Sequence, residues 1–178
     1  MEQMNSREVY TNPWMVVRED VVRRADGSEG IYGVIHKPAY ALVIALDGDR
    51  VHLVEQYRYP IGMRRWEFPQ GTAPGRAVVD PGELAARELR EETGLRAAHM
   101  LELGTLDVAA GMSSQRGRAF LATGLTQGAH AREIEEQDMR TAWVPRAEFE
   151  KMIEAGEVTD AQSIAAYAQL LLHERRAK

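Results

Sequence analysis

The sequence contains no cysteine, and this absence excludes disulfide bonds, thiolate metal sites and a cysteine nucleophile. Any metal ion must therefore be bound through oxygen or histidine ligands. Long apolar runs are missing too, because the longest, residues 40–46, is far too short to cross a bilayer. The first residues lack the basic and then apolar pattern of a signal peptide, so we expect a cytoplasmic protein with no membrane partner.

Positively charged residues are fewer than negatively charged ones, with 22 Lys and Arg against 27 Asp and Glu, and the formal net charge is −5. A broad basic surface for nucleic acid is therefore not expected. An anionic small-molecule substrate would need local arginines or a bridging cation. The chain of 178 residues suits one compact domain with its own core.

Alternating apolar segments and turn-forming residues predict a protein of mixed strands and helices. Two helices are expected at the C-terminal end, one opened by Pro145 and ended by Gly156, the other capped by Asp160. The last helix has an apolar stripe made of Ile164, Ala165, Ala168, Leu171 and Leu172. Strands are expected at residues 14–22, 31–35, 40–46, 51–57, 65–68, 100–108, 118–123 and 141–144.

A further helix is expected from Pro81 to Thr93, with Asp80 as its N-cap and Gly94 as its stop. Positions separated by three and four residues share one helix face, and here they place three carboxylates together, those of Glu88, Glu91 and Glu92. Neighbouring carboxylates repel one another, and a hard divalent cation such as Mg²⁺ removes that cost. The alternative is a solvated acidic face flanked by Arg87 and Arg90.

The segment Arg87-Glu88-Leu89-Arg90-Glu91-Glu92-Thr93-Gly94-Leu95 matches the second half of the Nudix box at every fixed position, and residues 66–71 resemble the strand and glycine that enter the box. The chain is thus identified as resembling the Nudix hydrolases. The front half departs from the family pattern. Gly71 precedes Arg87 by sixteen residues, two more than in the family, and Val79 stands where the first glutamate belongs.

The resemblance implies an α+β fold, an α/β/α sandwich in which helices flank a mixed β-sheet, with an N-terminal antiparallel strand extension. It also implies a bound Mg²⁺, with Mn²⁺ as a substitute. Glu88 and Glu92 resemble the principal metal ligands, Glu91 an additional or water-mediated one, and the Gln70 carbonyl a further one. Arg87 resembles the structural arginine that orients the loop, and Gly71 and Gly94 the structural glycines of the box.

Within the family, the chain looks most similar to the ADP-ribose and nucleotide-sugar pyrophosphatases. Arg58 in Glu55-Gln56-Tyr57-Arg58 resembles an arginine that contacts substrate phosphate, and the alternative is a surface cation at a strand end. Glu67 is expected either to contact substrate or to brace the loop. Gln115 stands where these enzymes often have a glutamate, and as an amide it suits hydrogen bonding to substrate but not proton removal.

The same resemblance divides the single domain into two parts. Residues 1–38 form the strand extension, which builds a homodimer in the related enzymes and helps cover the partner's substrate. Residues 39–178 form the Nudix core. The extension places Trp14 and the apolar residues after it far from the box, in agreement with such a role.

The expected reaction is Mg²⁺-dependent hydrolysis of the pyrophosphate bond in a nucleoside diphosphate derivative, first of all ADP-ribose, to AMP and ribose 5-phosphate. The catalytic base is expected in the acidic segment 133–138, with Glu135 and Glu136 preferred over Glu133 and Asp138, and with Glu91 as the remaining candidate. Three alternatives stay open: another nucleotide-sugar pyrophosphatase, an RNA 5′ pyrophosphohydrolase, and a non-catalytic nucleotide sensor. The intact acidic helix argues against the sensor.

Overall fold

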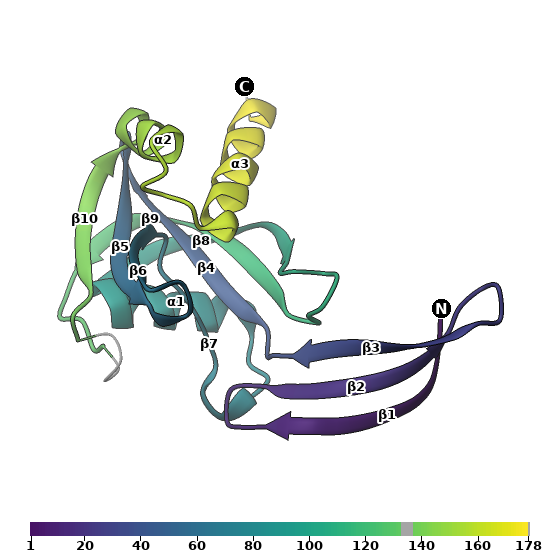
Figure 1. Cartoon of the computed structure of the whole chain (residues 1–178). Helices are drawn as coiled ribbons and strands as arrows, with labels where there is room; N and C mark the ends of the chain where they lie inside the picture. The colour runs from purple at the N-terminus through teal and green to yellow at the C-terminus, as the bar shows by residue number, and fades with distance from the viewer. Residues whose placement is uncertain (133–136, 178) are drawn as a thin grey trace.

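A computed structural model describes residues 1–132 and 137–177 of the chain. The body of the protein is a mixed β-sheet with α1 on one face and α2 and α3 on the other (Figure 1). A separate three-stranded sheet projects from this body as an arm. The expected α+β fold with helices on both faces of the sheet and an N-terminal strand extension is therefore confirmed.

The arm consists of β1 (Glu2–Thr11), β2 (Val16–Arg23) and β3 (Glu29–His36), paired antiparallel in that order. Gly27, in the turn between β2 and β3, has φ 82°, a left-handed conformation that glycine adopts without strain. β1 is exposed along its whole length. It was not expected as a long strand, because a strand that buries neither face shows no alternation of apolar and polar residues.

The central sheet follows the order β10-β5-β4-β9-β8, and β6 and β7 pair with β5 and β4. β4 and β9 run parallel, and the other pairs are antiparallel. The parallel pair places β4 at the centre, where all but its last two residues are buried. The strands are β4 (Tyr40–Asp47), β5 (Arg50–Arg58), β6 (Met63–Glu67), β7 (Gln70–Thr72), β8 (Leu95–Asp107), β9 (Arg116–Gln127) and β10 (Arg140–Pro145).

Side chains of β4 alternate between two apolar cores, one on each face of the sheet. Leu42 and Ile44 pack with α2 (Arg146–Glu154) and α3 (Ala161–Arg176). Ala41 and Val43 pack on the other face with α1 (Pro81–Thr93). Within the described ranges 1–132 and 137–177, no helix is long and apolar enough to cross a membrane.

The buried face of α3 differs from the stripe expected from sequence. Ser163, Ala166, Tyr167 and Leu170 are buried, whereas Leu172 of the expected stripe is 52% exposed. Two of the buried residues are polar and have hydrogen-bond partners. The Ser163 hydroxyl accepts from the Phe68 amide, and the Tyr167 hydroxyl donates to Glu150. Ile164 and Leu171 of the expected stripe do pack against the core, so hydrophobicity alone gave the buried face in part, and it missed the hydroxyl groups that are hydrogen-bonded inside the core.

Candidate active site

Helix α1 begins and ends where the sequence predicts. The Asp80 side chain accepts hydrogen bonds from the amides of Gly82 and Glu83, which satisfies two of the free donors at the helix start. Gly94 follows the last turn with φ 76° and donates its amide to the Arg90 carbonyl. These two caps fix the residues at which the helix begins and ends.

The three glutamates of α1 differ in exposure. Glu92 is 1% exposed and Glu88 is 7% exposed, while Glu91 is only half-buried. Gly71, in β7, lies directly against the Glu88 carboxylate, where a Cβ atom would overlap the carboxylate oxygens. Strand β7 and helix α1 therefore meet at Glu88, and a larger residue at position 71 would force the carboxylate to move.

Arg87 pairs with two of these carboxylates. Its Nη2 lies 3.3 Å from Glu88 Oε1, and its Nε lies 3.7 Å from Glu91 Oε2. Arg90 also pairs with Glu91, at 3.0 Å. The contacts shown for Arg87 are thus with its own helix, and its role in orienting the preceding loop stays a prediction.

The donor chemistry of α1 fits a hard divalent cation. Its side chains supply carboxylate oxygens, the ligands that such cations prefer. Two of the three are buried, and one of these, Glu88, lies against Gly71. A buried carboxylate is costly unless it is paired or bound to a metal. Among the residues that the structure describes, no group of three or more His, Asp or Glu side chains is already arranged around a metal position.

A pocket of about 620 Å³ lies beside this helix and includes Gly71. Its lining also contains Arg58, Glu67, Gln70 and Gln115. All three residues expected to bind substrate, Arg58, Glu67 and Gln115, therefore share one cavity, although they come from β5, β6 and the loop before β9. That volume is within the range of small-molecule sites.

Arg58 and Glu67 form a two-point ion pair within the pocket. The Arg58 Nε and Nη2 atoms donate to the two carboxylate oxygens, and Gln56 Nε2 donates to Glu67 Oε1 at 2.7 Å. Glu67 is 1% exposed, and burial raises the pKa of its carboxyl to about 7, although Arg58 opposes the shift. Glu67 thus fixes the direction of Arg58, and its contact with substrate or with the loop stays a prediction.

Glu67→Gln should change the pH dependence of stability. The unfolded chain ionises this carboxyl near pH 4.5 and the folded chain near pH 7, so the folded protein loses stability relative to the unfolded chain as pH rises between these values. The variant lacks this loss. Urea unfolding at both ends of the window should therefore show a steeper decline for the wild type, whereas parallel profiles would contradict the raised pKa.

Several residues of the pocket were not expected there from the sequence. Lys37 and Arg65 add positive charge, and Asp160 accepts from Gln70 Nε2 at 3.1 Å while also capping α3. Tyr40 is buried with its ring directly against Gly117, and burial and the nearby Asp160 raise its pKa. No local motif marks these residues, because they come together only through the sheet and the start of α3.

Gln115 is 8% exposed and donates its side-chain amide to the Pro38 carbonyl at 3.0 Å. The loop that carries it also contacts the arm, since Tyr32 donates its hydroxyl to the Gly111 carbonyl and the Ile35 amide donates to the Met112 carbonyl. Hydrogen bonds therefore join the pocket wall at Gln115 to strand β3.

Most of the acidic segment proposed to contain the base falls outside the described residues. This applies to Glu133, Glu135 and Glu136. Asp138 is described, and its carboxylate pairs with Arg64 Nη1 at 2.5 Å. Arg64 also donates to the Asp138 carbonyl at 2.9 Å, so this end of the segment is tied to β6.

Comparisons with known proteins agree with this geometry. The model of the NUDIX domain matches residues 36–167, and that of the nucleoside diphosphate sugar hydrolase N-terminal domain matches residues 1–35. An ADP-ribose pyrophosphatase of Mycobacterium tuberculosis is 37% identical over 166 residues, covering 92% of this chain and 80% of its own length.

Two further proteins are similar over most of the chain. A CMP-5'-(N-acetyl-N-hydroxy-3-aminopropyl)phosphonate hydrolase of Streptomyces rubellomurinus is 28% identical, covering 92% of this chain and 79% of its own length. The crystal structure of an ADP compounds hydrolase superposes with a TM-score of 0.80 at 20% identity, covering 98% of this chain and 94% of that one, and supports the fold. By its domain match and its relatives, the chain belongs to the Nudix family of pyrophosphohydrolases.

Proposed function

We propose that this Nudix enzyme is a Mg²⁺-dependent pyrophosphohydrolase of nucleoside diphosphate derivatives, with ADP-ribose as the first candidate substrate and AMP and ribose 5-phosphate as products. The observation that carries the proposal is the meeting of Glu88 and Gly71 at the edge of the cavity that contains Arg58. The ADP-ribose pyrophosphatase and the CMP-phosphonate hydrolase described above are both named for nucleotide derivatives, and this supports the choice of substrate class.

Glu88 and Glu92 would hold the metal, with Glu91 and the Gln70 carbonyl as further ligands. When bound, the ion neutralises charge on the diphosphate oxygens and lowers the pKa of the attacking water. We propose Mg²⁺ because all these donors are oxygens, and Mn²⁺ would substitute for it. Members of the family use a divalent metal, and the choice of ion is part of the proposal.

The pocket's own cations would bind and orient the substrate. Arg58, held in place by Glu67, presents a guanidinium to the cavity, and Lys37 and Arg65 add two more positive charges. A guanidinium forms strong charge-assisted hydrogen bonds with phosphate. Water then attacks one phosphorus, and the bond between that phosphorus and the bridging oxygen breaks, so the two products each carry a phosphate.

The general base is proposed to be Glu135 or Glu136, the two glutamates that come shortly before Asp138 in the sequence, and Arg64 pairs with Asp138. Glu135→Gln or Glu136→Gln should slow turnover more than Glu133→Gln or Asp138→Asn at saturating Mg²⁺. Steady-state rates of the four variants provide the measurement. Equal rates in all four would place proton removal elsewhere, first of all at Glu91.

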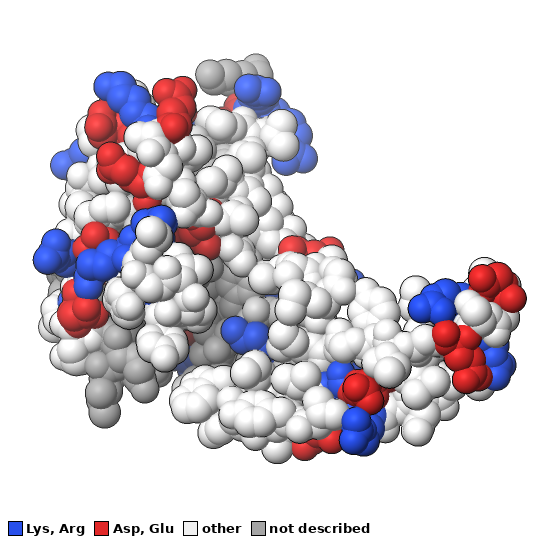
Figure 2. Space-filling view, viewed as in Figure 1, with Lys and Arg blue, Asp and Glu red and all other residues white. Residues whose placement is uncertain are grey.

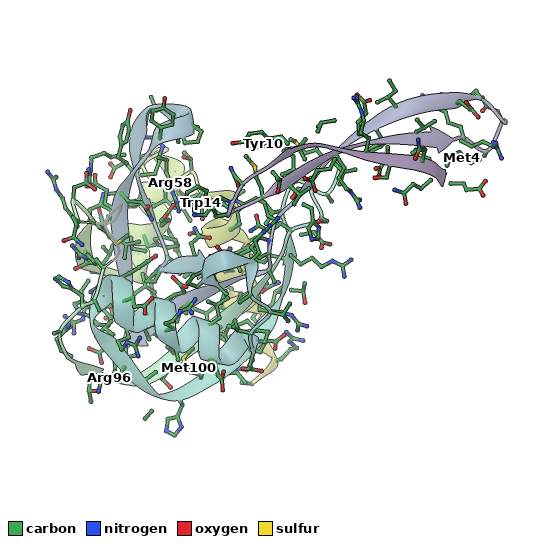
Figure 3. All side chains as sticks on the ribbon, turned by 90° about the horizontal axis from the view of Figure 1, so that it is seen from below. Met4, Tyr10, Trp14, Arg58, Arg96 and Met100 are labelled. Atoms are coloured by element: carbon green, nitrogen blue, oxygen red, sulfur yellow. The ribbon has the colours of Figure 1, made fainter. Side chains whose placement is uncertain are left out.

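The arm is proposed to join two copies into a homodimer. Its outer strand β1 is exposed along its length, and Tyr10 and Trp14 are exposed at the end nearest the body (Figure 3). On the face shown in Figure 2, charged side chains lie at the tip and near the middle of the arm, and the part nearest the body is mostly uncharged. Light scattering at micromolar concentration should give twice the chain mass of 20.0 kDa. A monomer would contradict the proposal.

A panel of nucleoside diphosphate derivatives at fixed Mg²⁺, with products identified by chromatography, separates the remaining substrates. ADP-ribose should give the highest kcat/KM. If a nucleotide sugar, a CMP derivative or a 5′-triphosphorylated RNA gave a higher kcat/KM, that compound would replace ADP-ribose as the proposed substrate. Tight binding of ADP-ribose without any product would indicate a nucleotide sensor.

A further inference from the structure

A second cavity, of about 440 Å³, lies on the outer side of α1, where this helix meets the start of β8. Figure 3 places Arg96 and Met100 on one side of α1 and Arg58 on the other. The second cavity is therefore separated from the substrate pocket by the helix that bears the metal-ligand candidates. The residues that decide its chemistry are Arg87, Leu89, Arg90, Arg96, Ala97 and Met100.

The lining combines an apolar floor with a cationic rim. Leu89 is buried, and Ala97 and Met100 are half-buried, so the floor presents aliphatic and thioether groups. The rim has three arginines and one acidic group, the exposed Glu83. Arg96 is exposed, and its guanidinium has no ion pair or hydrogen bond among the described residues. Such a site suits an anion attached to a flat apolar group.

Arg87 connects this cavity to the metal-ligand candidates. It lines the cavity, and at the same time it pairs with Glu88 at 3.3 Å and with Glu91 at 3.7 Å. Its Nε is buried and has no hydrogen-bond partner within residues 1–132 and 137–177. An anion in the cavity would give that N–H group an acceptor, in competition with the carboxylates.

We propose that the second cavity is a regulatory site for a small organic phosphate with a flat apolar group, and that its occupation strengthens metal binding on the opposite side of α1. Arg96 and Arg90 bind the phosphate, and the apolar group packs on Leu89 and Met100. Arg87 turns toward the phosphate, and this removes a competing positive charge from Glu88 and Glu91. Coupling of this kind is reciprocal, so bound metal strengthens phosphate binding by the same factor.

The first test uses 1-naphthyl phosphate as the probe and the metal-free protein. Its binding should shift the backbone ¹H–¹⁵N resonances of residues 83–100 in the wild type. Arg96→Ala should weaken that binding about 10-fold, the usual effect of losing a charge-assisted hydrogen bond. Arg175→Ala is the matched control, because Arg175 is an exposed arginine of α3 away from the cavity, and it should bind as the wild type does.

Two results would overturn the site. One is a set of shifts confined to the substrate pocket, around Arg58 and Gln115. The other is equal probe affinity in Arg96→Ala and the wild type. Arg96 has no part in the proposed catalysis, so Arg96→Ala should keep the basal rate, and the binding result does not depend on which substrate the enzyme hydrolyses.

The second test measures the coupling by calorimetric titration of Mn²⁺ into the protein. Saturating 1-naphthyl phosphate should lower the Kd for Mn²⁺ about 5-fold in the wild type, at the low end of typical coupling between sites. Arg96→Ala, compared with the wild type at a probe concentration near the wild-type Kd, where few of its own sites are filled, corrects for Mn²⁺ bound by the free phosphate and should show a clearly smaller fall in Kd. Equal Mn²⁺ affinity with and without the probe in the wild type would overturn the regulatory role.

Discussion

Glu92→Gln and Glu88→Gln should each lower turnover by at least ~100-fold while leaving the fold intact, because loss of a metal ligand removes on the order of 3 kcal/mol of transition-state stabilisation. Both side chains are buried, at 1% and 7% exposure, and Glu88 lies against Gly71, which lines the substrate pocket. Glutamine has almost the same shape but no charge, so it keeps the packing and binds a hard cation poorly. Steady-state kinetics at saturating Mg²⁺, with thermal unfolding of each variant, gives the measurement.

Glu154→Gln provides the matched control, since Glu154 is exposed at the end of α2 and undergoes the same chemical change away from the site. It should keep the wild-type rate. Near-normal turnover in both Glu88→Gln and Glu92→Gln would remove these residues from the metal site.

Gly71→Ala should reduce turnover about 100-fold, the loss expected when a catalytic group is displaced by roughly 1 Å. A Cβ at position 71 would overlap the Glu88 carboxylate, and that side chain has to move, since the backbone of β7 is fixed by its pairing with β4. Overpacking of this kind also destabilises a protein by about 1–3 kcal/mol. The variant should therefore bind Mn²⁺ more weakly and melt at a lower temperature.

Gly33→Ala is the control for this change. Gly33 lies in β3, its added Cβ would meet nothing within 4 Å, and its backbone is not in the left-handed region. Its activity should match the wild type. If Gly71→Ala retained full activity and full Mn²⁺ affinity, the close approach of β7 to Glu88 would not be needed for metal binding or turnover.

The sequence predicts α1 well because local chemistry determines its ends. Asp80 satisfies free amides at the start, and Gly94 takes the left-handed conformation at the stop. Both effects act within one helical turn, so no distant contact is needed to recognise them. The spacing of the three glutamates follows from the same helix.

The pocket is only partly predictable, because its walls come from segments far apart in the chain. Arg58, Glu67 and Gln115 were found through resemblance to the family, and the structure places them in one cavity. Tyr40 and Asp160 were missed as pocket residues, since they meet only when β4 and the start of α3 come together. Neither stands in a motif that marks a site.

The buried face of α3 was predicted only in part, for a different physical reason. A hydrophobicity count treats serine and tyrosine as surface residues, yet Ser163 and Tyr167 are buried with their hydroxyl groups hydrogen-bonded. Their partners Phe68 and Glu150 are not adjacent to them in sequence. Burial of a polar group depends on a distant partner, and periodicity alone does not reveal it.

The most direct test of the central claim is hydrolysis of ADP-ribose by the purified protein, with products separated by chromatography, in Mg²⁺ and again after chelation of the metal. We expect AMP and ribose 5-phosphate in equal amounts with Mg²⁺, no reaction after chelation, and recovery when Mg²⁺ is restored. The same rate with and without chelator, or no AMP from ADP-ribose at saturating Mg²⁺, would contradict the proposed function.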